Sequence, residues 1–128
     1  MKARARPRRD PVPKEASVVT KATLRAADRL TIKNNALAKI VGLSEPTITR
    51  MRRGTYVLDS GDKAFELALL FVRLYRSLDS IVDGDDDVAK SWINNDNLAL
   101  RGRPLELIQS VSGLTNVIQY LDTRRALV

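Results

Sequence analysis

The side chains on which most enzymes depend for nucleophilic, redox or metal chemistry are scarce in this sequence of 128 residues. It contains no cysteine and no histidine, which excludes disulfides, thiolate and imidazole metal sites, cysteine nucleophiles and a Ser-His-Asp arrangement. Carboxylate, lysine and tyrosine chemistry remain open to it. Asp79, Asp83 and Asp96 are candidate acid-base groups, but no partner residues mark them as catalytic. We therefore expect them to be solvated, and we expect a protein that is not an enzyme.

A run of aspartates offers the oxygen ligands that calcium prefers, but its spacing does not fit a calcium loop. The run comprises Asp83, Asp85, Asp86 and Asp87. An EF-hand loop that began at Asp83 would need glycine at its sixth position and glutamate at its twelfth, where this chain has Val88 and Asn94. Negative charge is favourable at the start of a helix, with Asp86 paired to Lys90 one turn later. We expect a helix N-terminus here, with no metal and no cofactor.

Arginine, threonine and glutamate side chains between residues 44 and 53 have the chemistry needed to read DNA. Arg50 can span guanine O6 and N7, Glu45 can accept from a cytosine amino group, and Thr49 can touch a thymine methyl group or a phosphate. Phosphate contacts are expected from Ser44, Thr47, Arg52 and Lys33. The candidate DNA-binding residues are Ser44, Glu45, Pro46, Thr47, Thr49, Arg50, Arg52 and Arg53.

The residues from 34 onward have the spacing of a helix-turn-helix that would position these side chains. The motif needs a small residue where its helices approach, a glycine in the turn and apolar residues at fixed places. Ala38 is the small residue, Gly42 is the turn glycine, and Ser44 can cap the second helix. The apolar places hold Leu37, Val41, Leu43, Ile48 and Met51. The alternative is a three-helix module with a merely solvated basic face, which the charge of the segment disfavours.

Charge is divided unevenly along the chain. Residues 1–54 contain 14 Lys and Arg against 4 Asp and Glu, whereas residues 55–128 contain 8 against 11. This division predicts a module that binds a polyanion, joined to a second one with a different partner. Residues 1–14 carry six basic residues and three prolines, so we expect an arm without a core of its own. The arm is either a solvated tail or a contact to DNA phosphates or an acidic partner.

Apolar residues recur at helical intervals through the rest of the chain, which predicts an all-α fold. A first helix is expected from Ser17, as its cap, to near Ile32. The longest is expected over 61–78, with apolar residues on two sides. Gly113 is expected to separate the last two helices. The other expected helices cover 34–40, 44–53, 85–92, 104–111 and 114–124. No apolar run approaches 18 residues, so we expect a cytosolic protein without a membrane partner.

Two segments of the chain resemble parts of one known family. Residues 34–53 resemble the helix-turn-helix of bacterial Xre-type regulators. The second segment is WINNDNLALRGRPLEL at 92–107, followed by Gly113, Val117 and Leu121. It resembles the toxin-binding domain of the Xre/MbcA/ParS antitoxin family, whose pattern is Trp-Leu, an asparagine, Leu-x-Gly, Pro-Leu-x-Leu, a glycine, then Val and Leu. The chain departs from this pattern at Arg103, where the family often has threonine, and from Arg125 onward, where it often has glycine.

The resemblance implies a bacterial, cytoplasmic antitoxin whose partner is a RES-domain toxin that degrades NAD. It also implies a homodimer that binds operator DNA and represses the shared promoter. A basic tail suits a pocket that holds phosphate-bearing NAD; alternatively the tail is frayed and the Asn-rich loop blocks the toxin. The candidate toxin-binding residues are Asn95, Asn97, Arg101, Arg103, Arg124, Arg125 and Val128.

The expected organisation is an arm at 1–14, a helix-turn-helix module at 15–58 and a toxin-binding domain at 59–128. The alternative function is a stand-alone helix-turn-helix repressor whose second half only dimerises or senses another partner. A small enzyme is a third hypothesis, and the missing catalytic constellation weighs against it.

Overall fold

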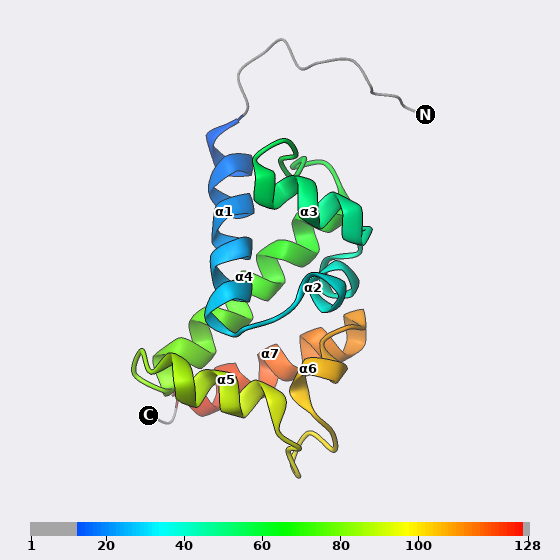
Figure 1. Ribbon diagram of the computed structural model, residues 1–128. Helices are drawn as coiled ribbons and strands as arrows, with labels where there is room; N and C mark the ends of the chain where they lie inside the picture. Colours follow the sequence, from blue (N-terminus) through cyan, green and yellow to red (C-terminus); the bar gives the residue numbers. More distant parts are fainter. Residues whose placement is uncertain (1–12, 127–128) are drawn as a thin grey trace.

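Seven helices make up the regular structure of residues 13–126, which are the residues that this computed structural model describes. They are α1 (Lys14–Arg29), α2 (Asn34–Val41), α3 (Glu45–Arg53), α4 (Lys63–Ile81), α5 (Asp86–Asn94), α6 (Pro104–Leu107) and α7 (Val111–Ala126). Among these residues no β-strand occurs, and the one β-type pairing is an isolated bridge between Asn97 and Gly102. The predicted all-α fold is confirmed (Figure 1).

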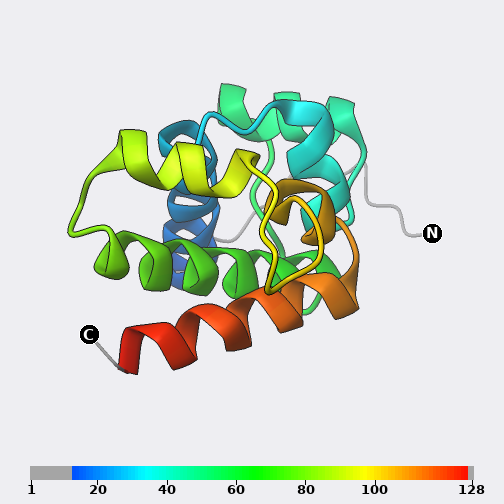
Figure 2. The same cartoon turned by 90° about the horizontal axis from the view of Figure 1, so that it is seen from below.

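The longest helix, α4, forms the centre of the molecule. It contacts α1, α2 and α7, and Figure 2 shows it between α7 and the layer that contains α1. Phe71, Leu74 and Leu78 of α4 are fully buried in the core. Burial of this helix on two sides was expected from its wide apolar surface and is confirmed. Leu69 is an exception, because 43% of it is exposed.

The helix pair predicted from residue 34 onward is present, with the expected ends. Gly42 follows α2 with a φ of 73°, and Gly54 follows α3 with a φ of 79°. Both lie in the left-handed region, which favours glycine at the end of a helix. The Ser44 hydroxyl caps α3 by accepting from the backbone N–H of Thr47 at 3.2 Å. The residues that lock the two helices together are buried: Leu37, Ala38, Val41, Ile48 and Met51.

Helix α1 differs from the prediction at both ends. It begins at Lys14, one turn before the predicted cap Ser17. Pro13 stands at the N-cap, and Ala16 is buried, so packing favours the additional turn. The helix ends at Arg29 instead of near Ile32, because Thr31 adopts a left-handed φ of 57° that ends the helix.

The last two helices also differ from the prediction. Helix α6 ends at Leu107, well before Val111, and α7 begins at Val111, so that Gly113 lies inside the first turn of α7 and not between the helices. A Cβ atom at Gly113 would lie 1.9 Å from the carbonyl oxygen of Leu107. The glycine is therefore required by the close approach of α7 to the end of α6.

Gly113→Ala should lower the free energy of unfolding by about 1 to 3 kcal/mol, because backbone and not a flexible side chain must move to admit the methyl group. Equilibrium denaturation with urea measures this change. Gly61→Ala is the matched control, since its Cβ would meet only the Asp59 side chain at 3.7 Å and its φ is not left-handed. Its unfolding free energy should change by less than about 0.5 kcal/mol. Equal losses for the two variants would contradict this account of Gly113.

An ion pair joins the first helix to the second half of the chain. Arg29 Nη1 of α1 lies 3.5 Å from Asp86 Oδ2 at the start of α5. Asp86 was expected to pair with Lys90; that prediction is wrong, because the end of α1 brings a cation across to α5. The Asp85 carboxylate caps α5 by accepting from the backbone N–H groups of Asp87 and Val88. The aspartate run thus stands at a helix N-terminus, as its charge predicted.

Candidate functional site

The second helix of the pair, α3, lies on the outside of the molecule (Figure 1). Its leading end and outer side carry most of the residues that were predicted to contact DNA. Exposed are Ser44, Glu45, Pro46, Arg50, Arg52 and Arg53. Thr49 is half-buried, and its hydroxyl donates to the Glu45 carbonyl oxygen at 3.3 Å. The helix thus presents Glu45, Arg50 and Arg53 to solvent, a set that can contact base edges and phosphates.

A short hydrogen-bond chain holds the Arg50 side chain in place. Arg50 Nη2 donates to Thr47 Oγ1 at 2.9 Å, and the hydroxyls of Thr47 and Ser44 share a hydrogen bond of 2.8 Å. Thr47 is only 9% exposed, which leaves it little surface for a phosphate. Its position instead suits it to orient the guanidinium of Arg50. The remaining donors of Arg50 can still form the paired contacts that a guanine edge accepts.

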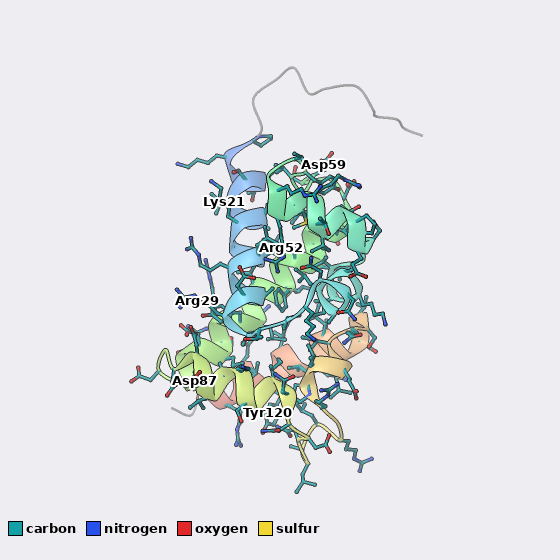
Figure 3. The ribbon with its side chains drawn as sticks, viewed as in Figure 1. Lys21, Arg29, Arg52, Asp59, Asp87 and Tyr120 are labelled. Atoms are coloured by element: carbon teal, nitrogen blue, oxygen red, sulfur yellow. The ribbon has the colours of Figure 1, made fainter. Side chains whose placement is uncertain are left out.

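Arg52 joins α3 to the two preceding helices. Its Nε donates to Asn34 Oδ1 at 2.7 Å, and its Nη1 lies 2.8 Å from Asp28 Oδ1. Figure 3 shows Arg52 between α1 and α3. Its side chain is 30% exposed and its charge is compensated by Asp28. The geometry therefore gives Arg52 a structural part in holding α3 at its angle, which the sequence pattern did not indicate.

A second candidate surface lies at the other end of the molecule, where the segment between α5 and α6 projects (Figures 1 and 2). Two backbone hydrogen bonds close this segment into a loop: Asn97 N–H to Gly102 O at 2.9 Å, and Gly102 N–H to Asn97 O at 3.3 Å. The Asn97 side-chain oxygen also accepts from the backbone N–H of Leu100 at 3.0 Å. Asn97 therefore shapes the loop from inside, and it is half-buried.

The other polar residues of the loop region differ in their exposure and in their hydrogen bonds to the rest of the protein. Arg101 is exposed, with a left-handed φ of 60°. Arg103 Nη2 donates to Glu106 Oε2 at 2.9 Å. Asn95 is exposed and its amide donates to Ser91 Oγ at 3.0 Å. Arg101 is thus the cation that this loop offers most openly to a partner.

Two family models match this chain. The model described as an antitoxin Xre-like helix-turn-helix domain matches residues 4–73, and the antitoxin Xre/MbcA/ParS C-terminal toxin-binding domain matches residues 77–126. The first of them alone covers more than half of the sequence. The chain belongs to the Xre/MbcA/ParS antitoxin family. A comparison with curated proteins found no match.

The family match confirms the predicted resemblance and indicates the general function of each matched domain. Antitoxins of this family are not enzymes; the helix-turn-helix binds DNA and the C-terminal domain binds a toxin. The two matched regions meet within α4, which contacts both α1 and α7. The predicted division of the chain at residue 58 stays a prediction. Within residues 13–126, no helix has the length and apolar character to span a bilayer.

The antitoxin separates its loop from its basic C-terminal residues. The loop lies over the first half of α7, whereas Arg124 and Arg125 lie at the far end of that helix (Figure 2). Val111 and Arg124 are about 20 Å apart along the axis, at about 1.5 Å per residue. Val128 and most of the predicted arm, residues 1–12, lie outside the described residues. The predicted toxin contacts therefore form two groups and not one continuous patch.

Each arginine at the end of α7 has partners within the antitoxin. Arg124 lies over the Tyr120 ring at 5.3 Å, and Tyr120 stacks on Trp92 with ring centroids 6.3 Å apart. Figure 3 shows Tyr120 beneath α5. Trp92 is half-buried in this stack, which joins α5 to α7. Sequence analysis missed Tyr120, because a tyrosine spaced like a surface residue gives no sign of its aromatic partner.

Arg125 belongs to a separate polar cluster between α4 and α7. Its Nη1 lies 3.5 Å from the hydroxyl of buried Ser77. Ser77 Oγ donates to Asp122 Oδ1 at 2.7 Å, and Arg73 forms an ion pair with the same carboxylate. These hydrogen bonds, that of Ser77 first, lower the pKa of Asp122 despite the opposing effect of desolvation. Asp122 therefore stays charged and fastens α7 to α4.

Proposed function

We propose that this antitoxin binds operator DNA as a homodimer through α3, represses its own operon, and neutralises a RES-domain toxin that degrades NAD. The observation that carries the proposal is the placement of two polar surfaces on opposite ends of one molecule, α3 at one end and the loop between α5 and α6 at the other (Figure 1). Each surface belongs to a different matched region. Such an arrangement allows DNA and a protein partner to bind at the same time.

On the DNA side, the proposal assigns base reading to Arg50, assisted by Glu45 and Thr49. Arg53 and Ser44 are proposed to contact phosphates, as is Lys33, which is exposed just before α2. Pro46 lies at the first turn of α3 and is exposed. Thr47 and Arg52 are proposed to act mainly by holding Arg50 and α3 in position. Two copies of α3 in a symmetric dimer would enter major grooves about 34 Å apart.

On the toxin side, the proposal assigns the contact to Asn95, Asn97, Arg101 and Arg103 of the loop region, with Arg124, Arg125 and Val128 at the chain end. The pocket that binds the phosphates of NAD can also accept a cation from another protein chain only if carboxylates or backbone oxygens line the pocket. Arginine is suited to such contacts, because its planar fork forms charge-assisted hydrogen bonds. The work of this protein would take place in the bacterial cytosol, where operator DNA is found.

The experiment that tests the proposal uses the reading frame next to the antitoxin gene. Expressed alone, its product should arrest growth and lower cellular NAD, and co-expression of the antitoxin should restore both. The two proteins should also co-purify, and the purified antitoxin should protect a symmetric site in the shared promoter from nuclease cleavage. Promoter protection without a toxic neighbour would favour the stand-alone repressor instead. A toxic neighbour that leaves NAD unchanged would refute the RES assignment alone.

A further inference from the structure

The loop between α5 and α6 presents a leucine to solvent almost completely. Leu98 is 98% exposed. The next most exposed large apolar residues in the described part of the chain are Val111 at 59% and Val18 at 53%. Single exposed apolar residues are common on protein surfaces, but one at the tip of a projecting loop has its whole side chain available to a partner.

The loop holds Leu98 outward and does not let it fold back onto the core. The Asn97 and Gly102 backbones are paired on both sides of the tip, and the Asn97 side chain binds the backbone N–H of Leu100. Leu100 packs against the core. Gly102 lies close to Leu107, since a Cβ atom there would come within 3.3 Å of the leucine side chain. The loop is thus ordered before a partner arrives, which lowers the entropy cost of binding.

The surface beside Leu98 has the chemistry of a protein contact. A hollow of about 450 Å³ next to the loop is lined by Trp92 and Val88 and by polar residues, which are Asp87, Ser91, Asn95, Asp96 and Asn97. Val88 is 50% exposed. On the other side of the tip stands the exposed Arg101. An exposed apolar side chain, a hollow that contains one aromatic residue and an open arginine are together suited to a protein contact, since aromatic residues and arginine are enriched at protein interfaces.

We propose that Leu98 is the apolar anchor of the antitoxin on its toxin, and that the toxin receives it in an apolar socket with carboxylates placed to meet Arg101. This inference rests on the proposed toxin neutralisation and adds the residue and the partner chemistry on which that contact depends. Because the Leu98 side chain is almost fully exposed in the free protein, nearly all of its apolar surface would be removed from water on binding, and this burial contributes to affinity.

A second copy of the antitoxin fits this surface less well than a toxin. The loop lies at the end of the molecule opposite α3 (Figure 1). A dimer joined through two loops would therefore point its two α3 helices away from each other, at a separation that does not suit adjacent major grooves. A different protein at the loop leaves α3 free for DNA.

The test measures the affinity of full-length antitoxin variants for the product of the adjacent reading frame, purified from the neutralised complex by denaturation and refolding. Leu98→Ala should weaken binding by about 10- to 100-fold. Leu98→Asp should weaken it further, because it would place a charge in the apolar socket. Leu69→Ala is the control, since Leu69 is also partly exposed but lies on α4, and its affinity should equal that of the wild type.

The readouts distinguish failure of this inference from failure of the proposed function. If the wild-type chain binds the toxin and both Leu98 variants bind equally well, or if Leu69→Ala weakens binding as much, the anchor is not Leu98. If the Leu98 variants change the sedimentation of the antitoxin alone, the occupant is a second copy and the inference is overturned. If the wild-type chain does not bind, the toxin assignment fails and the inference with it. Unchanged binding of promoter DNA by each variant shows that it is folded.

Discussion

Arg50→Ala should weaken binding of the antitoxin to its operator by about 10- to 100-fold, which corresponds to about 1 to 3 kcal/mol. The loss should be concentrated at one base position, because the fork of Arg50 is held by Thr47 at 2.9 Å and can face only one guanine. Binding measured against operators with single substitutions checks this: the variant should no longer distinguish the bases at that position.

Arg52→Ala is the informative control for Arg50. Arg52 is bound to Asn34 and Asp28, so its loss should weaken binding to all operator sequences alike and should lower the melting temperature as α3 loses its attachment. Arg50→Ala should leave the melting temperature nearly unchanged, since Arg50 is exposed. Operator binding that is unaffected by Arg50→Ala and Arg53→Ala together would show that α3 is not the DNA-reading helix.

A chain that carries both Arg101→Ala and Arg103→Ala should fail to protect cells from the toxin. The two arginines stand on either side of Gly102, and no other basic residue lies in the loop between α5 and α6. Their removal takes away the charge-assisted hydrogen bonds that the loop offers, each of which is worth about 1.5 to 3 kcal/mol. Growth and the NAD level during co-expression measure the loss.

Truncation after Asp122 tests the other group of proposed contacts, because it removes Arg124, Arg125 and Val128 together. It should impair neutralisation less than the loop variant does, since Arg124 and Arg125 already bind Tyr120 and Ser77 within the antitoxin. Asp122 itself remains, and with it the attachment of α7 to Ser77 and Arg73. Protection that survives the loop change but not the truncation would move the toxin contact to the chain end.

Local chemistry explains why much of the helix-turn-helix was predictable from sequence. The caps at Gly42, Ser44 and Gly54 depend on backbone conformation and on neighbours within a few residues. Burial of Ile48 and Met51 follows from helical spacing alone. For the same reason the exposure of Arg50 and Arg53 on the outer side of α3 could be expected before any tertiary contact was known.

The errors arose where a contact with another helix determines the local structure. Gly113 was expected to separate two helices, because glycine commonly ends a helix. It lies in the first turn of α7 instead, and it must be glycine there because the Leu107 backbone at the end of α6 comes too close for a side chain. Asp86 was expected to bind Lys90, its neighbour on the same helix, but the fold supplies Arg29 from α1. Neither contact leaves a trace in the spacing of nearby residues.

The sequence by itself determined the helical class, the position of the helix-turn-helix and the family, since each depends on residue types at short and regular intervals. Beyond the outer side of α3, only the tertiary structure decided which polar residues are open to a partner. The packing of the helices places Thr47 and Arg52 in hydrogen bonds within the DNA-binding half. It also separates the loop from the basic end of α7 and leaves Leu98 almost fully exposed. These outcomes depend on how helices far apart in the chain pack together, because that packing brings donors to acceptors and covers one apolar side chain while leaving another in water.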